Sequence, residues 1–167
     1  PAGRFRMSAD RRDKWRARLP RDVGLRAGLV WSGKPTHKND HNLSISLARL
    51  APLRALHGVT FVSLQREMNE TDLAEMANWP ALIRLENELA DFADTAAVIA
   101  ELDLVIAVDT AVAPLAASLG KPRWILLPQV PDWRWLLNPP ASPWYPWARL
   151  FRHPVLARWA CVVARVT

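Results

Sequence analysis

Short apolar stretches alternate with amphipathic segments along most of the chain. The apolar stretches are nearly continuous, which is typical of strands that are buried on both faces. The segments between them carry apolar residues at helical spacing. This order predicts an α/β fold, a Rossmann-like parallel sheet with helices on both faces. The expected strands are residues 25–31, 59–64, 82–85, 104–108 and 123–127, with a last short strand at 150–152, and the expected helices are residues 9–19, 46–56, 71–78, 95–102, 111–119 and 155–166.

Several residues mark the ends of these helices. Ser8, Thr71 and Asp94 are expected to cap helix starts, because their side chains can accept a hydrogen bond from a backbone N–H one turn ahead. Gly120 supplies a helix stop. The segment 128–149 holds four of the nine tryptophans, so we expect an ordered loop there.

One loop differs from the others in length and polarity. Residues 32–42 follow the first strand and contain almost no apolar residue. Connections in α/β units are usually shorter, so a long polar loop at the carboxyl end of a strand points to a function. In doubly wound sheets, a crevice opens where the strand order reverses, here at the carboxyl ends of residues 25–31 and 104–108.

Residues at these two strand ends suit an anionic ligand. The helix that starts after residue 110 offers backbone N–H groups to a diphosphate, and the small side chain of Ala111 allows close approach. Lys34 and Lys38 add positive charge, although loop lysines are commonly just solvated, and Thr110 has the alternative role of a helix cap. The expected binding residues are Ser32, Gly33, Lys34, Lys38, Gln65, Asp109, Thr110 and Ala111.

Composition narrows the class of protein further. With 167 residues, of which 50% are hydrophobic, the chain can bury the core of one ordinary domain. It contains no apolar run of membrane-spanning length and no apolar signal segment, so we expect a cytoplasmic protein without a membrane span. The single cysteine, Cys161, has no partner for an internal disulfide and no neighbouring metal ligand. We therefore expect no metal and no cofactor, and a role in core packing for Cys161.

The net charge of +6 fits an anionic partner, from nucleic acid to a phosphorylated small molecule. Much of the excess comes from arginines in residues 4–21, interleaved with aspartates in a pattern typical of a solvated helix face. No nucleic-acid recognition motif is present, so nucleic acid is not the expected partner. A P-loop is excluded, because Gly33-Lys34-Pro35-Thr36 lacks the preceding glycine at the required spacing.

Several stretches form a specific combination. They are GLVWSGKP at residues 28–35 with HKND at 37–40, FVSLQ at 61–65, LADFADTA at 89–96, LDLVIAVDT at 102–110 with LGKP at 119–122, and PDWRW at 131–135 with SPWYP at 142–146 and RLFR at 149–152. Together they resemble the C-terminal domain of bacterial lipopolysaccharide heptosyltransferase-like proteins, in particular the branch that carries TPR repeats. The resemblance extends from about residue 22 to the C-terminus.

The resemblance implies an inverting GT-B glycosyltransferase. Residues 22–167 would be its nucleotide-sugar-binding domain, preceded by a linker helix in residues 1–21. The implied partners are a nucleotide-diphosphate sugar and an N-terminal acceptor-binding domain that this sequence does not contain. Such enzymes take their carboxylate base largely from that N-terminal half, so no catalytic residue is assigned here and the isolated chain is expected to be inactive.

Two positions depart from the family pattern. Pro114 replaces a histidine in the pattern Asp-Thr-x-x-x-His, and Leu43 stands where relatives commonly carry arginine. Proline fits only the first turn of a helix, so we expect the helix to start near Val112 or Ala113 and to leave the carbonyl of Thr110 free. The lost polar groups keep a second interpretation open: a degenerate, non-catalytic nucleotide-sugar-binding or interaction module of a TPR protein.

Overall fold

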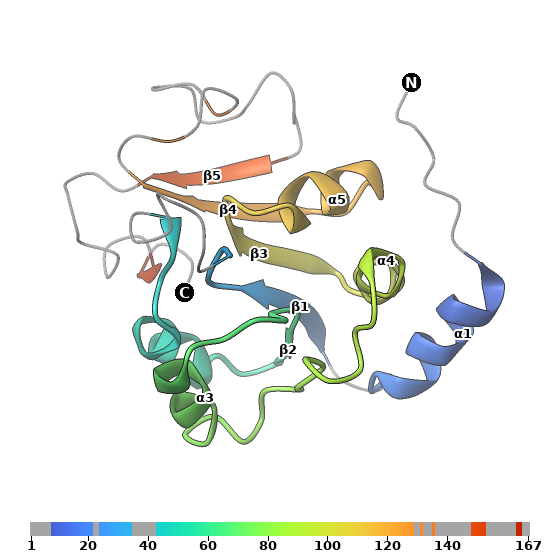
Figure 1. Ribbon diagram of the computed structural model, residues 1–167, viewed down its shortest axis with the longest axis horizontal. Helices are drawn as coiled ribbons and strands as arrows, with labels where there is room; N and C mark the ends of the chain where they lie inside the picture. Colours follow the sequence, from blue (N-terminus) through green and yellow to red (C-terminus); the bar gives the residue numbers. More distant parts are fainter. Residues whose placement is uncertain are drawn as a thin grey trace.

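Five parallel strands form the central sheet of the computed structural model, in the order β2-β1-β3-β4-β5 (Figure 1). The structure describes residues 8–21, 24–34, 43–128, 131, 135, 148–152 and 163–164. Its strands are β1 (Leu25–Val30), β2 (Val59–Ser63), β3 (Leu104–Val108), β4 (Arg123–Leu127) and β5 (Ala148–Arg152). The predicted α/β fold class, with a Rossmann-like parallel sheet, is confirmed.

Helices cover both faces of this sheet (Figure 1). They are α1 (Ala9–Arg18), the 3-10 helix η1 (Leu47–Ala55), α3 (Glu70–Met76), α4 (Phe92–Ala100) and α5 (Val112–Ser118). Strand side chains alternate between the two faces, so successive residues enter different core layers. Leu29 packs in the layer that η1 and α3 cover, whereas Val30 packs in the layer that α4, α5 and α1 cover.

The strand expected at residues 82–85 is wrong. Only Ile83 pairs with the sheet, through one isolated bridge to Val62 of β2. Its backbone N–H donates to the Phe61 carbonyl at 2.9 Å, and its carbonyl accepts from Ser63 N at 2.8 Å. The backbone before Ile83 forms a turn, in which Leu82 N donates to the Trp79 carbonyl. The extended segment that remains is too short for a strand.

Two predicted helix caps are also wrong. Asn69 caps α3 in place of Thr71, and its side chain accepts from Asp72 N at 2.7 Å. Asp91 caps α4 in place of Asp94, and its carboxylate accepts from Asp94 N at 2.8 Å. The side chain of Asp94 is instead buried against α1. Ser8 caps α1 as predicted.

The helix expected at 46–56 is a 3-10 helix, η1. Pro52 lies inside it and has no N–H to donate to a carbonyl four residues earlier, which disfavours an α-helix there. The loop at 128–149, the helix expected at 155–166 and Cys161 lie wholly or largely outside the described residues. In the described part of the chain, no helix combines the length and apolar character needed to cross a lipid bilayer.

The charged side chains of α1 are largely exposed, as expected of a solvated helix face, but its arginines also make ion pairs. Trp15 is fully buried in the layer that also contains α4. The ion pairs surround it on an otherwise charged helix. They join Arg11 to Asp91 and Asp94, Arg12 and Arg16 to Glu101, and Arg18 to Glu88. Several charges that the composition leaves free for an external anion are thus used within the protein.

Candidate functional site

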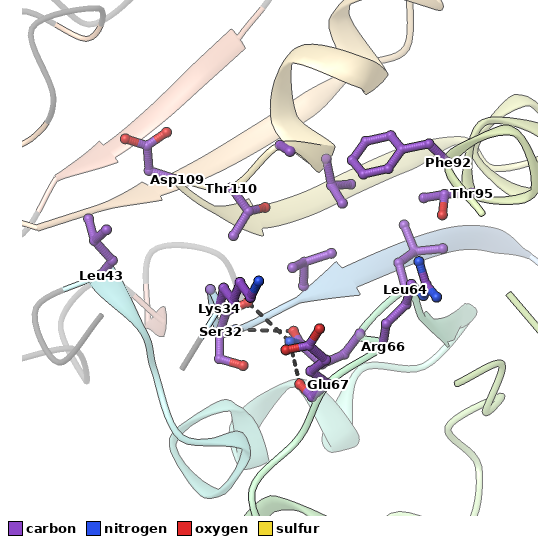
Figure 2. A pocket seen from close by; sticks show the side chains of 15 residues that line it. Ser32, Lys34, Leu43, Leu64, Arg66, Glu67, Phe92, Thr95, Asp109 and Thr110 are labelled. Carbon is purple, nitrogen blue, oxygen red and sulfur yellow. Dashed lines mark hydrogen bonds between the residues drawn. The ribbon is translucent and has the colours of Figure 1, made fainter. Parts of the chain in front are cut away.

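A cavity of about 490 Å³ lies at the carboxyl ends of β1 and β3 (Figure 2). The chain passes from β1 outward to β2 and then returns across β1 to β3, so these two strands flank the point where the strand order reverses. Ligands of open α/β sheets bind at this position, because the loops on either side diverge there. The lining residues are Val30, Ser32, Gly33, Lys34, Leu43, Leu64, Gln65, Arg66, Glu67, Phe92, Thr95, Asp109, Thr110, Ala111 and Val112.

Seven of the eight residues predicted from the sequence line this cavity. Ser32, Gly33 and Lys34 come from the end of β1, and Asp109, Thr110 and Ala111 from the segment between β3 and α5. Gln65 comes from the end of β2. Lys38 lies outside the described residues. The structure thus brings together residues that are up to 79 positions apart, from Ser32 to Ala111.

The start of the polar loop after β1 is held by hydrogen bonds to two other segments. Gly33 N donates to Ser44 Oγ at 2.9 Å, and Ile45 N donates to the carbonyl of Trp31 at 2.7 Å. Asp72, which is 1% exposed, accepts from the indole Nε1 of Trp31 at 3.0 Å. These contacts fix residues 31–33 at the cavity wall while Lys34 stays exposed.

Gln65 uses its whole side-chain amide inside the protein. Its Oε1 accepts from the backbone N–H groups of Trp31 and Ser32 at 3.2 and 3.1 Å. Its Nε2 donates to the carbonyls of Ser32 and Glu67 at 3.1 and 2.9 Å. All four hydrogen-bonding positions of the amide are therefore occupied. Gln65 lines the cavity, but its amide joins the ends of β1 and β2 and does not point a free group at a ligand.

The segment between β3 and α5 has a tight turn. Thr110 N donates to the Val108 carbonyl at 2.7 Å, and Ala113 N donates to the Thr110 carbonyl at 3.1 Å. The expected helix start near Val112 is confirmed. The expected free carbonyl of Thr110 is wrong, because the 3-10 type bond from Ala113 occupies it. Among the described residues, Thr110 Oγ1 is a buried side-chain atom without a hydrogen-bond partner.

Positive charge flanks the cavity at two positions. Lys34 and Arg66 are both exposed and both line it, and neither takes part in a salt bridge within the described residues. Arg66 was not predicted, although it follows Gln65 at the carboxyl end of β2, where the same reasoning applies. Glu67 adds one carboxylate to this wall.

The remaining wall is apolar and comes partly from α4. Phe92 is 52% exposed although it is a large hydrophobic residue, and it lines the cavity together with the buried Thr95 (Figure 2). Val30, Leu64 and Val112 belong to the core layer that α4 covers and continue this wall. Sequence reasoning missed Phe92 because it placed the start of this helix at residue 95.

No group of three or more His, Cys, Asp or Glu side chains with the geometry of a metal site occurs among the residues that the structure describes. The hydrogen-bond donors that line the cavity are hydroxyl, ammonium, guanidinium and backbone N–H groups, and the carboxylates of Glu67 and Asp109 add acceptors. The donors favour hydrogen bonding and charge pairing with an anion.

The fold is therefore a Rossmann-like α/β domain with its cavity at the switch point of the sheet. Two solved structures are similar to it. One is an E. coli heptosyltransferase, WaaC, with ADP-2-deoxy-2-fluoro heptose, at a TM-score of 0.59 and 16% sequence identity. The match covers 93% of this chain and 46% of that chain.

The other is an E. coli ADP-heptose lps heptosyltransferase II, at a TM-score of 0.55 and 15% identity, with 98% of this chain and 52% of that chain covered. The chain thus spans about half the length of each structure. At these identities the likeness establishes the fold. No protein-family model matches the sequence, and no curated protein matches it at a significant level.

Proposed function

We propose that this chain is the donor-binding domain of a GT-B glycosyltransferase and that its cavity binds a nucleotide-diphosphate sugar. The observation that carries the proposal is the division of one switch-point cavity into two chemically different ends. Polar and charged groups, among them Lys34 and the carboxylate of Asp109, gather where β1 and β3 end, and apolar side chains gather beside α4. A nucleotide diphosphate has the same division, with an anionic diphosphate and a flat, largely apolar base.

The diphosphate belongs at the polar end in this proposal. Lys34 supplies an exposed ammonium group, and Ser32 and Gly33 form the adjacent loop. The hydroxyl of Thr110, which has no partner among the described residues, provides a group that a ligand oxygen can satisfy. Hydrogen bonds between charged groups are stronger than neutral ones, so Lys34 is expected to contribute most of the affinity at this end.

The base belongs at the apolar end. The ring of Phe92 is half exposed at the cavity rim, and an aromatic ring in this position can stack on any nucleobase. Arg66 lies on the same cavity and can pair with a phosphate or stack on the base. Adenine is the first base to test, because the similar WaaC structure holds an ADP sugar.

Acceptor binding and the general base are assigned to the N-terminal half of a GT-B enzyme. The proposal therefore has this chain bind the donor and stabilise the departing diphosphate, while the chain alone transfers no sugar. Sugar transfer by this chain alone, to any acceptor including water, would contradict that division of labour.

Isothermal titration calorimetry with ADP, UDP and GDP, and with their sugar conjugates, tests the proposal. At least one nucleotide should bind, and Lys34→Gln should weaken it roughly tenfold, as expected for one lost charge-assisted hydrogen bond. Arg21→Gln is the control, because it removes one positive charge at an exposed position outside the cavity. No binding of any nucleotide, or equal effects of the two substitutions, would overturn the proposal, as would tighter binding of an oligonucleotide than of every nucleotide.

A degenerate module of a TPR protein is the second candidate, and Pro114 and Leu43 favour it. Neither side chain can donate a hydrogen bond, and Leu43 lines the cavity. A protein that contains both GT-B halves and binds the donor, yet transfers no sugar, would support this alternative. Transfer by that protein would exclude it.

A further inference from the structure

The first turn of α4 contacts two different parts of the structure. One side lines the cavity with Phe92 and Thr95, which Figure 2 shows together at one end of it. The other side faces α1, which packs beside α4 (Figure 1). A displacement of this turn would therefore change the cavity wall and the contact with α1 together.

Two residues of α1 hold the two carboxylates at this turn. Arg11 Nη1 donates to Asp91 Oδ1 at 2.6 Å and to Asp94 Oδ1 at 3.4 Å. The indole Nε1 of the fully buried Trp15 donates to the same Asp94 oxygen at 3.3 Å. The carboxylates are held by α1 on one side and by the backbone of α4 on the other.

Both carboxylates also shape the start of α4 directly. Asp91 is its N-cap and accepts from Asp94 N at 2.8 Å. Asp94 Oδ2 accepts from Ala90 N at 3.2 Å. The hydrogen bond from Arg11 lowers the pKa of Asp91, with a smaller contribution from the bond that Asp94 N donates, so Asp91 stays ionised as a cap. The residue that follows this cap is Phe92.

We propose that Arg11 and Trp15 are positioning residues for the cavity. When α1 is docked, it holds the first turn of α4 in place as a cavity wall, and this raises the affinity of the cavity for a nucleotide. The inference rests on the proposed function, since it concerns the same cavity. It has a reciprocal consequence: a bound nucleotide strengthens the docking of α1 by the same factor. Any movement of the chain that pulls on α1 would then weaken nucleotide binding.

The opposite end of α4 provides a matched control. Arg12 Nε donates to Glu101 Oε1 at 2.8 Å, and Glu101 is the C-cap residue of α4. Arg12 and Arg11 are neighbours on one helix, each pairs with a carboxylate at one end of α4, and both are partly exposed. Glu101 does not line the cavity. The two arginines therefore hold opposite ends of α4, Arg11 through two carboxylates and Arg12 through one that Arg16 also contacts.

The test compares Arg11→Gln with Arg12→Gln. Both melting temperatures should fall, because Arg11→Gln loses the pairs to Asp91 and Asp94, and Arg12→Gln loses one of the two pairs that Glu101 makes with α1. Arg11→Gln should weaken binding of the tightest of ADP, UDP and GDP by about threefold or more, the effect of disturbing one hydrogen bond to a ligand, whereas Arg12→Gln should not. Trp15→Phe should also weaken binding, and Arg11→Lys should restore part of it. Equal nucleotide affinities of Arg11→Gln and Arg12→Gln would overturn the inference.

Amide hydrogen exchange without ligand separates this inference from the proposed function. Exchange at residues 92–97 should be faster in Arg11→Gln than in Arg12→Gln. If the unsubstituted protein binds no nucleotide, the proposed function fails, and the part of the inference that concerns the α4 wall is decided by exchange alone. Equal exchange at 92–97 in the two variants would overturn that part.

Discussion

Gln65 and Ser32 exchange two hydrogen bonds between the ends of β2 and β1. Ser32 N donates to Gln65 Oε1, and Gln65 Nε2 donates to the Ser32 carbonyl, each at 3.1 Å. Gln65 Oε1 also accepts from Trp31 N, and Gln65 Nε2 also donates to the Glu67 carbonyl, so all four hydrogen-bonding positions of the amide are used. Only a side chain that both accepts and donates in this geometry can make all four. Gln65 therefore holds the two neighbouring walls of the cavity at a fixed separation.

Gln65→Glu should lower the free energy of unfolding and weaken nucleotide binding. At neutral pH a carboxylate keeps the two accepted bonds but leaves the partly buried carbonyls of Ser32 and Glu67 without the donor of Gln65, and an unsatisfied group costs about 1–3 kcal/mol when it is fully buried. Denaturant unfolding and calorimetry measure the two effects. Asn87→Asp makes the same chemical change at an exposed position and should alter neither. Unchanged affinity in Gln65→Glu would show that the cavity does not depend on this link.

The sequence predicts the sheet well because a strand that is buried on both faces is apolar at almost every position. Residues 104–108 and 123–127 are apolar at every position or nearly so, and both strands occur with the predicted bounds. The place of the site follows as well, since the reversal in strand order brings the ends of β1 and β3 together. The rule that ligands bind where the strand order reverses can be applied from the order of strands and helices alone.

The parts that could not be predicted depend on which way a polar side chain turns. Gln65 at a strand end fits a ligand contact as well as a link between strands, and the outcome depends on backbone groups 33 and 34 positions away. Asp94 has the sequence context of a cap, yet its carboxylate is used by Trp15, 79 positions earlier. Local sequence patterns do not predict contacts between residues so far apart in the chain.

Acid should loosen α1. The hydrogen bond from Arg11 lowers the pKa of Asp91. Burial raises the pKa of Glu101, but hydrogen bonds from Arg12 and Arg16 outweigh it and the net shift is downward. Carboxyl groups with lowered pKa values stabilise the folded state above their usual pKa, here 3.8 for Asp91 and 4.5 for Glu101, and this contribution is lost as the pH falls through the lowered values.

The docking of α1 should therefore be unchanged from neutral pH to about pH 5 and should weaken below about pH 4. Hydrogen exchange within residues 9–18 as a function of pH measures it. Glu101→Gln should show a shallower loss, since one of the titrating groups is removed. The same loss of protection in both proteins would mean that the α1 ion pairs do not govern its acid response.

Phe92→Ala should weaken nucleotide binding with little effect on stability. The ring is 52% exposed, so its removal opens no core cavity. Stacking of an aromatic ring on a base is worth about 1–3 kcal/mol, so affinity should fall roughly fivefold or more. Binding of inorganic diphosphate should be unchanged, because it has no base. Leu73→Ala removes an exposed apolar side chain of α3 outside the cavity and serves as the control. Equal losses for nucleotide and diphosphate would contradict a base site at Phe92.

Pro114→His should improve diphosphate binding. Pro114 is the third residue of α5, and its missing N–H costs no intrahelical bond there, because the first turn of a helix leaves such groups without partners. The ladder begins one residue later, where Leu115 N donates to the Ala111 carbonyl at 3.3 Å. Replacement should therefore leave α5 in place. An imidazole would add the donor that the resembling family has at this position, and one charge-assisted hydrogen bond is worth roughly 1.5–3 kcal/mol, or about tenfold or more in affinity.

Pro114→Ala separates the imidazole from the backbone. Both substitutions restore an N–H and free the chain from the proline ring, and both should lose about 0.4–1 kcal/mol of stability because the unfolded chain gains conformations. Only the histidine variant should bind inorganic diphosphate and ADP more tightly, and its gain should grow below about pH 6.5, where imidazole becomes charged. If calorimetry finds the same affinity in both variants, or weaker binding with histidine, the donor at this position does not reach the ligand in this chain. The diphosphate would then depend on Lys34 and the loop after β1.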